Sequence, residues 1–112
     1  MAKIDRIERL NSLIRREISE ILLYKIKDPR IGFVTVTNVS VSRDLRYAKV
    51  YISVFDKDEE EVKKGLESAK KFIRGILGKR LKIKYIPELI FIIDHSLKEG
   101  DRILKIMKDI DE

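Results

Sequence analysis

The chain lacks the residue types on which many catalytic and metal sites depend. Its 112 residues include no cysteine and a single histidine, His95. The missing thiols exclude disulfides, cysteine catalysis and Cys-ligated zinc or iron–sulfur centres, and a single histidine excludes a His-rich metal site. Glutamine is also absent, and only two asparagines accompany 39% charged residues. This composition is typical of proteins from thermophiles.

Long apolar stretches are missing as well. The first ten residues, MAKIDRIERL, carry charges at short intervals and do not resemble a secretory signal, and no apolar run approaches the roughly 18 residues of a membrane helix. We therefore expect a cytoplasmic protein. With 44% hydrophobic residues and no Gly-, Ser- or Pro-rich linker, residues 1–112 should form a single folded domain.

Positive charge is concentrated in one segment. Residues 63–84 carry a net charge of +8 against +6 for the whole chain, so the remainder carries −2. Glu67 is the only acid in this segment, against nine cations: Lys63, Lys64, Lys70, Lys71, Arg74, Lys79, Arg80, Lys82 and Lys84. A local excess of this kind is typical of a surface that contacts a polyanion.

The first half of the chain predicts a helix followed by a β-hairpin. Apolar residues recur at helical spacing over residues 4–26, and Pro29 should end that helix. Residues 33–42 and 46–55 are rich in β-branched residues and form two adjacent strands. In the first strand, either a bulge near Asn38 resets the alternation or Phe33, Val39 and Val41 share the core face.

Three aromatic residues of the second strand share one face. Tyr47, Tyr51 and Phe55 are four residues apart, and such a row can stack nucleic-acid bases. We favour the alternative that they pack in the core, because the second face of the sheet also has to be covered by helices.

A second amphipathic pattern covers residues 62–81. Its periodicity predicts one continuous helix over residues 59–81, with Asp58 as the N-cap. Five of the cations fall within about 120° of arc on its polar side. Gly75 and Gly78 have the GxxG spacing of a phosphate-backbone clamp, but the apolar residues between them continue the helical pattern. We therefore place both glycines inside the helix.

The last third of the chain predicts a buried strand over residues 88–94 and a closing helix. Ser96 and Glu99 form a capping box, and apolar residues continue at helical spacing to Ile110. His95, beside this cap, is interpreted as structural. The sum is an α+β domain with a three-stranded mixed sheet and helices mainly on one face.

The basic segment has several possible partners. One acid cannot neutralise nine cations within the helix, so a solvated surface of ion pairs is disfavoured and nucleic acid is the favoured partner. An acidic protein or a membrane surface is the alternative. An RNA-processing nuclease is a third class, but the sequence has no metal-binding carboxylate cluster and no activated nucleophile, so we expect neither a metal nor another cofactor.

The order helix, strand, strand, helix, helix, strand is that of a type II KH domain. The resemblance is more specific than the order of elements, because the sequences of residues 27–55 and 72–103 closely resemble those of the bacterial ribosome-binding factor A family. The similarity rests on the DPR-G turn, the SRDL-YAKVY hairpin, the LGK-L segment and the PEL-F strand entry.

The resemblance implies a non-catalytic assembly factor in the cytoplasm, acting as a monomer without membrane contacts. Such a factor binds the small (30S) ribosomal subunit late in its maturation, and the family is associated with processing of the 5′ end of precursor 16S rRNA and with adaptation to cold. In this family a kink marked by Ala-x-Gly divides the second helix and replaces the GxxG loop. Here Ala69 is kept and Lys71 takes the place of the glycine.

The concentration of positive charge and the family resemblance together indicate which residues should contact rRNA phosphates. They are the cations of the basic segment, with the hairpin cations Arg43, Arg46 and Lys49 as weaker candidates. Contacts of this kind supply affinity and orientation, whereas specificity must come from RNA shape or from ribosomal proteins.

Overall fold

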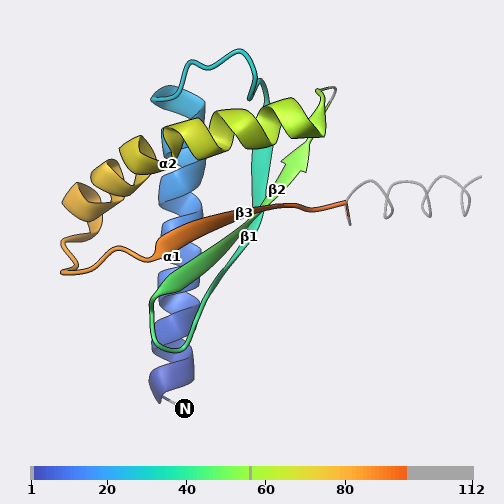
Figure 1. The fold of residues 1–112 in the computed structure, drawn as a ribbon. Coiled ribbons are helices and arrows are strands. Elements are labelled where there is room, and N and C mark those ends of the chain that lie inside the picture. Colours follow the sequence, from blue (N-terminus) through green and yellow to red (C-terminus); the bar gives the residue numbers. More distant parts are fainter. Residues whose placement is uncertain (1, 56, 96–112) are drawn as a thin grey trace, which may run out of the picture.

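The computed structural model describes residues 2–55 and 57–95, with side chains from residue 6 onward. Two helices and three strands follow in the predicted order: α1 (Ala2–Tyr24), β1 (Val34–Val41), β2 (Tyr47–Val54), α2 (Glu59–Leu81) and β3 (Glu88–Ile93) (Figure 1). The α+β class is therefore confirmed. The expected closing helix, with its Ser96–Glu99 capping box, lies outside the described residues.

The sheet has the order β1-β2-β3 and is mixed. β1 and β2 pair antiparallel as the predicted hairpin, whereas β2 and β3 pair in parallel. Parallel neighbours need a long crossover connection, and α2 supplies it. At the hairpin turn, Asp44 accepts hydrogen bonds from the Ser42 hydroxyl and the Arg46 backbone N–H, which holds the pKa of Asp44 below its ordinary value.

Of the two alternatives predicted for β1, the bulge is confirmed. The register with β2 shifts between Val36 and Asn38, so that Val36, Val39 and Val41 all face the core. Phe33 precedes the strand and remains 67% exposed, which rules out the alternative in which it shares the core face. The Thr37 hydroxyl at the bulge donates a 2.6 Å hydrogen bond to the Asp94 carboxylate, joining β1 to the residue that follows β3.

Only one face of the sheet is covered by the described helices. Alternate β2 residues, Ala48 to Val54, are buried in one cluster with residues of both α1 and α2. On the opposite face Tyr47 is 48% exposed, and Phe55, just past the strand, is 74% exposed. The prediction that these aromatics pack in the core is therefore wrong, because no described element covers their side of the sheet.

α2 is one continuous helix, bounded as the periodicity predicts. The Asp58 carboxylate caps it by accepting hydrogen bonds from the backbone N–H groups of Glu60 and Glu61. Gly75 and Gly78 lie inside the helix, as expected, and do not form a clamp loop. Figure 1 shows that α2 bends along its length, so that its two parts run in different directions, but the helix is not interrupted, and a kink at Ala69 stays a prediction.

An ion pair links the two helices. Arg80 Nη1 lies 2.7 Å from Glu17 Oε2 and 3.2 Å from Glu20 Oε2 of α1. The hydrogen bond to Glu17 raises the pKa of Arg80 above its ordinary value. Residues 63 and 80 are about 100° apart on a helical wheel at roughly 100° per residue, which turns Arg80 from the polar side of α2 toward α1.

The turn after α1 is held by local polar contacts and by packing against α2. Asp28 accepts hydrogen bonds from the backbone and guanidinium of Arg30, which lowers its pKa, so the stabilisation is present at neutral pH and is lost as the pH falls through that lowered value. Ile31 is buried beside Gly65, where an added Cβ would lie 2.7 Å from Ile31 Cγ1.

Replacing Gly65 and Gly75 of α2 by alanine should change the stability of the fold in opposite directions. Around Gly75 an added Cβ meets nothing within 4 Å, so Gly75→Ala should stabilise the fold by about 0.5–1 kcal/mol through helix propensity. Gly65→Ala should destabilise it by about 1–3 kcal/mol, because the methyl group would overlap Ile31. Urea unfolding midpoints measure both changes. A higher midpoint for Gly65→Ala would contradict this account of the α2 packing.

Two neighbouring cations at the end of α2 should also behave differently. Arg80→Ala should lower the urea midpoint, because it removes the contacts to Glu17 and Glu20. Lys79→Ala is the matched control, since Lys79 is exposed and makes no ion pair within the described part of the chain. Equal midpoints for the two variants would show that the Arg80 pair does not hold the helices together.

Candidate functional site

The predicted cations divide into groups once the chain is folded. Four lysines lie on the exposed side of α2 and two half-buried cations, Lys70 and Arg74, border it. We call these six the α2 basic face: Lys63, Lys64, Lys70, Lys71, Arg74 and Lys79. Lys82 and Lys84 follow in the connection to β3, and Arg43 and Arg46 lie at the hairpin turn. Lys49 is exposed on the uncovered sheet face, so the structure does not bring it together with the α2 basic face.

Some cations of the α2 basic face have acidic neighbours on the same helix. Lys64 Nζ lies 3.7 Å from Glu61 and Lys70 Nζ lies 2.7 Å from Glu67, each one helical turn away. Both carboxylates are at least half exposed, and such surface pairs contribute less than about 1 kcal/mol. A polyanion can therefore replace Glu61 beside the exposed Lys64 at low cost, whereas the Lys70 side chain is only 22% exposed and less accessible.

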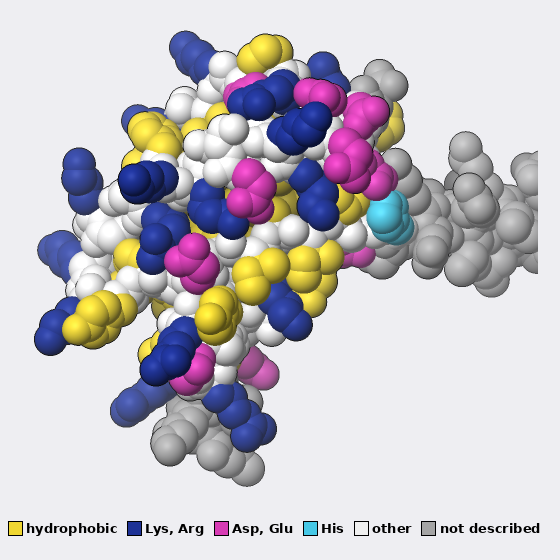
Figure 2. All heavy atoms as spheres, viewed as in Figure 1, with side chains coloured by type: hydrophobic (Ala, Val, Ile, Leu, Met, Phe, Trp, Pro, Cys, Tyr) yellow, Lys and Arg dark blue, Asp and Glu magenta, His cyan; other side chains and the backbone are white. Residues whose placement is uncertain are grey.

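The remaining lysines carry uncompensated charge. Within residues 2–55 and 57–95, no ion pair is formed by Lys63, Lys71, Lys79, Lys82 or Lys84. Figure 2 shows several acidic side chains near His95, and basic side chains over the rest of this side of the molecule with some acidic and hydrophobic side chains between them. The unpaired charge along α2 and its connection to β3 is what a phosphate-binding surface requires.

Arg74 has a structural role that the sequence pattern does not reveal. Its guanidinium donates hydrogen bonds of 2.9 Å to the Ile86 carbonyl and 3.2 Å to the Pro87 carbonyl, and it lies 3.6 Å from Glu88. The side chain is only 34% exposed. Arg74 therefore fixes the connection between α2 and β3 against the helix, and that connection in turn presents Lys82 and Lys84.

Aromatic rings accompany two of the lysines. Lys70 Nζ lies 5.9 Å from the centroid of the Phe91 ring, and Lys84 Nζ lies 5.5 Å from that of Tyr85. Phe91 is buried, whereas Tyr85 is 78% exposed. An exposed ring beside a cation can stack on a base while the cation contacts a phosphate.

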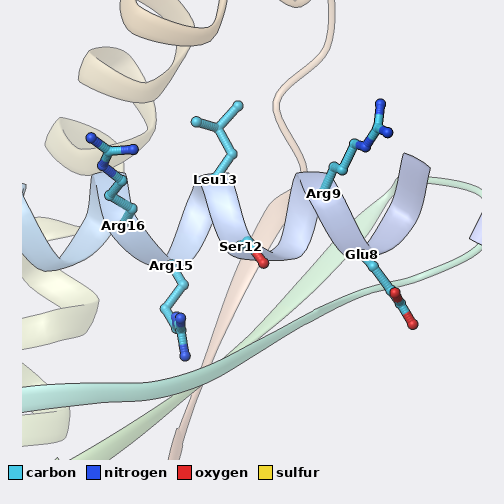
Figure 3. Close-up of a pocket in the computed structure, with 6 residues that line it drawn as sticks. All are labelled: Glu8, Arg9, Ser12, Leu13, Arg15 and Arg16. Atoms are coloured by element: carbon cyan, nitrogen blue, oxygen red, sulfur yellow. The ribbon is translucent and has the colours of Figure 1, made fainter. Parts of the chain in front are cut away.

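α1 adds arginines that the sequence reasoning did not select. Figure 3 shows Arg9, Leu13 and Arg16 projecting from one side of the helix, with Arg15 and Glu8 on the other. Because the residues around this hollow all belong to one helix, it is an open helix side and not an enclosed site. These arginines are exposed, and no motif or local charge excess in the sequence marks them as candidates.

The remaining polar features of the described residues are contacts at the surface. His95 Nε2 lies 2.7 Å from Glu59 Oε1 at the start of α2, a contact between two surface residues. Over the described residues, no group of three His, Cys, Asp or Glu side chains is placed to hold a metal ion. Neither described helix is long and apolar enough to cross a membrane.

Comparisons with known proteins identify the family. The family model described as ribosome-binding factor A matches residues 6–107. Ribosome-binding factor A from Dictyoglomus thermophilum is 55% identical over 108 residues, which cover 94% of this chain and 90% of that protein.

Solved structures agree with this assignment. The crystal structure of ribosome-binding factor A from Thermus thermophilus matches with a TM-score of 0.73 and 26% identity, covering 78% of this chain and 93% of that one. A homology model of the Thermus thermophilus factor, fitted into a cryo-EM map of its complex with 30S, matches with a TM-score of 0.67 and 26% identity, covering 76% and 91%. The resemblance in sequence, the KH-like order of elements and the family match agree, and the chain belongs to the ribosome-binding factor A family.

Proposed function

We propose that this protein binds the small ribosomal subunit through the α2 basic face and assists the subunit's late maturation. The unpaired charge of Lys63, Lys71 and Lys79 on one folded surface is the observation that carries this proposal. Family membership supports it, as does the Thermus thermophilus relative that has been fitted into a 30S complex.

The predicted cations take different parts in this proposal. Lysines 63, 64, 70, 71, 79, 82 and 84 contact rRNA phosphates. Arg74 contributes mainly by positioning the α2–β3 connection, and Arg80 is committed to α1. Arg43 and Arg46 supply a second, smaller contact at the hairpin turn, whereas Lys49 faces away from the α2 basic face.

The subunit's RNA shape supplies the specificity. Lysine is a flexible point charge that contacts phosphates without reading bases. We therefore assign the α2 basic face to affinity and orientation on a preformed rRNA surface. In this proposal the protein acts in the cytoplasm as a monomer and recognises the region of the 5′ end of precursor 16S rRNA, which nucleases then trim.

Three exposed lysines provide the direct test. Replacing Lys63, Lys71 and Lys79 together by alanine should reduce co-sedimentation with small subunits. It should also lower the slope of log affinity against log salt concentration by roughly 2–3, at about 0.7–0.9 for each phosphate that is no longer neutralised. The urea midpoint should stay near that of the parent protein, because these side chains are exposed.

Replacement of the same three lysines by arginine is the matched control and should retain subunit binding, because the charge is kept. Unchanged binding and salt slope in the alanine variant would refute the α2 basic face as the main contact. Co-sedimentation that survives RNase treatment would instead favour an acidic protein partner.

Processing is tested in a bacterial strain that lacks its own ribosome-binding factor A. Expression of this chain should lower the fraction of 16S rRNA that retains an extended 5′ end, measured by primer extension, whereas the triple alanine variant should not. Purified protein mixed with precursor 16S rRNA should leave the RNA intact. Cleavage by the pure protein would make it a nuclease and overturn the non-catalytic role.

A further inference from the structure

A pocket of about 690 Å³ lies apart from the exposed lysines of α2, where three distant segments of the chain meet. Leu10 of α1, Leu45 of the hairpin turn, and Ile83 and Ile86 of the α2–β3 connection contribute its apolar lining. A smaller hollow of about 260 Å³ shares Leu10 and Leu45 and extends the lining to Arg6 and Arg43. The two neighbouring hollows are lined by apolar and basic residues, and we call them together the hairpin pocket.

Leu45 is in an unusual conformation for its residue type. Its φ is 62°, in the left-handed region that side chains with a Cβ rarely adopt, and it is 47% exposed. A large apolar side chain at a strained and half-exposed position gains little by burial in the free protein. Strain of this kind is concentrated at binding sites, and here it holds an apolar side chain at the edge of the hairpin pocket.

The charge around the hairpin pocket favours an anion. Its cations are Arg6, Arg43, Arg46 and Lys84. Its two carboxylates are already engaged: Asp44 accepts hydrogen bonds at the hairpin turn and lies 3.9 Å from Arg46, and Glu88 lies 3.6 Å from Arg74. Within the described parts of the chain, Arg6, Arg43 and Lys84 form no ion pair.

One wall of the hairpin pocket offers a stacking surface. Tyr85 is 78% exposed, and Lys84 Nζ lies 5.5 Å from the centroid of its ring. An exposed aromatic ring beside an apolar recess fits a flat nucleobase, and stacking on such a ring contributes about 1–3 kcal/mol per base. The surrounding cations are placed for the phosphates on either side of that base.

We infer that the hairpin pocket binds one unstacked base of single-stranded RNA. The base lies against Tyr85 and Leu45, and the flanking phosphates contact Arg43, Arg46 and Lys84. This inference rests on the proposed function and adds a contact with a base to the phosphate contacts of the α2 basic face. An acidic peptide with an apolar side chain is the competing ligand, but a flat base covers the exposed Tyr85 ring face more completely than an aliphatic side chain does.

Tyrosine fluorescence provides the test, because the chain has four tyrosines and no tryptophan. A six-nucleotide oligouridylate should quench the fluorescence of the full chain on binding. Tyr85→Leu should remove most of the quenching and weaken binding at least fivefold. Leu45→Gly should also weaken binding at least fivefold. It should keep the urea midpoint, because glycine adopts this φ without strain.

Tyr24→Leu is the matched control. Tyr24 is 70% exposed, but it lies 14 residues beyond Leu10 along α1, about 20 Å at the rise of a helix. Its replacement should leave the oligonucleotide affinity unchanged. Equal affinity in the parent, Tyr85→Leu and Leu45→Gly proteins would overturn the inference. Displacement of the oligonucleotide by an equal concentration of an oligoglutamate peptide with one leucine would also overturn it, in favour of a protein ligand.

Small-subunit co-sedimentation of the same variants separates this inference from the proposed function. Subunit binding by the parent protein without any quenching by the oligonucleotide overturns the pocket inference alone. Quenching that depends on Tyr85 and Leu45, in a protein that does not bind subunits, supports the pocket and refutes the proposed function.

Discussion

Two helices bury one face of the sheet. The apolar side chains packed between the sheet and these helices determine which surfaces of the molecule are left for its charged residues. Ala48, Val50, Ile52 and Val54 are all turned to that face, and the bulge in β1 brings Val39 and Val41 to it as well. At roughly 25 cal/mol per Å² of apolar surface, this layer is the dominant favourable term in folding. It determines which side of α2 is left in water, and therefore where the charges can lie.

Arginines and lysines have different roles in this structure. Arg30, Arg74 and Arg80 make hydrogen bonds that join elements or fix turns, in each case through the planar guanidinium. Several lysines of α2 and its connection to β3 remain unpaired within the described residues. The rigid fork of arginine suits fixed contacts within the fold, whereas the flexible, hydrated lysine head suits contacts with phosphates. The net positive charge of the sequence therefore overstates the number of cations that are free to bind a partner, because several arginines are engaged within the fold.

The proposed contact with rRNA combines a rigid backbone, held by Arg74, with flexible lysine side chains. Arg74 holds the α2–β3 connection against α2, which fixes the backbone that carries Lys82 and Lys84 relative to that helix. Lysine contacts alone would hold the factor on many polyanions. In this proposal, shape complementarity to the subunit and the inferred base in the hairpin pocket supply the selectivity that charge cannot provide.

The elements and their limits could be predicted from the residues alone, since local periodicity and capping encode them. The apolar stripe of α2, its Asp58 cap, the hairpin and the concentration of lysines are all visible in the sequence. Three features instead depend on how the elements pack: Arg80 turns toward Glu17, Tyr47 and Phe55 stay exposed, and Leu45 and Tyr85 line one pocket. The partners in these contacts lie some 40 to 60 residues apart, beyond the range of any local pattern, so only the folded chain brings them together.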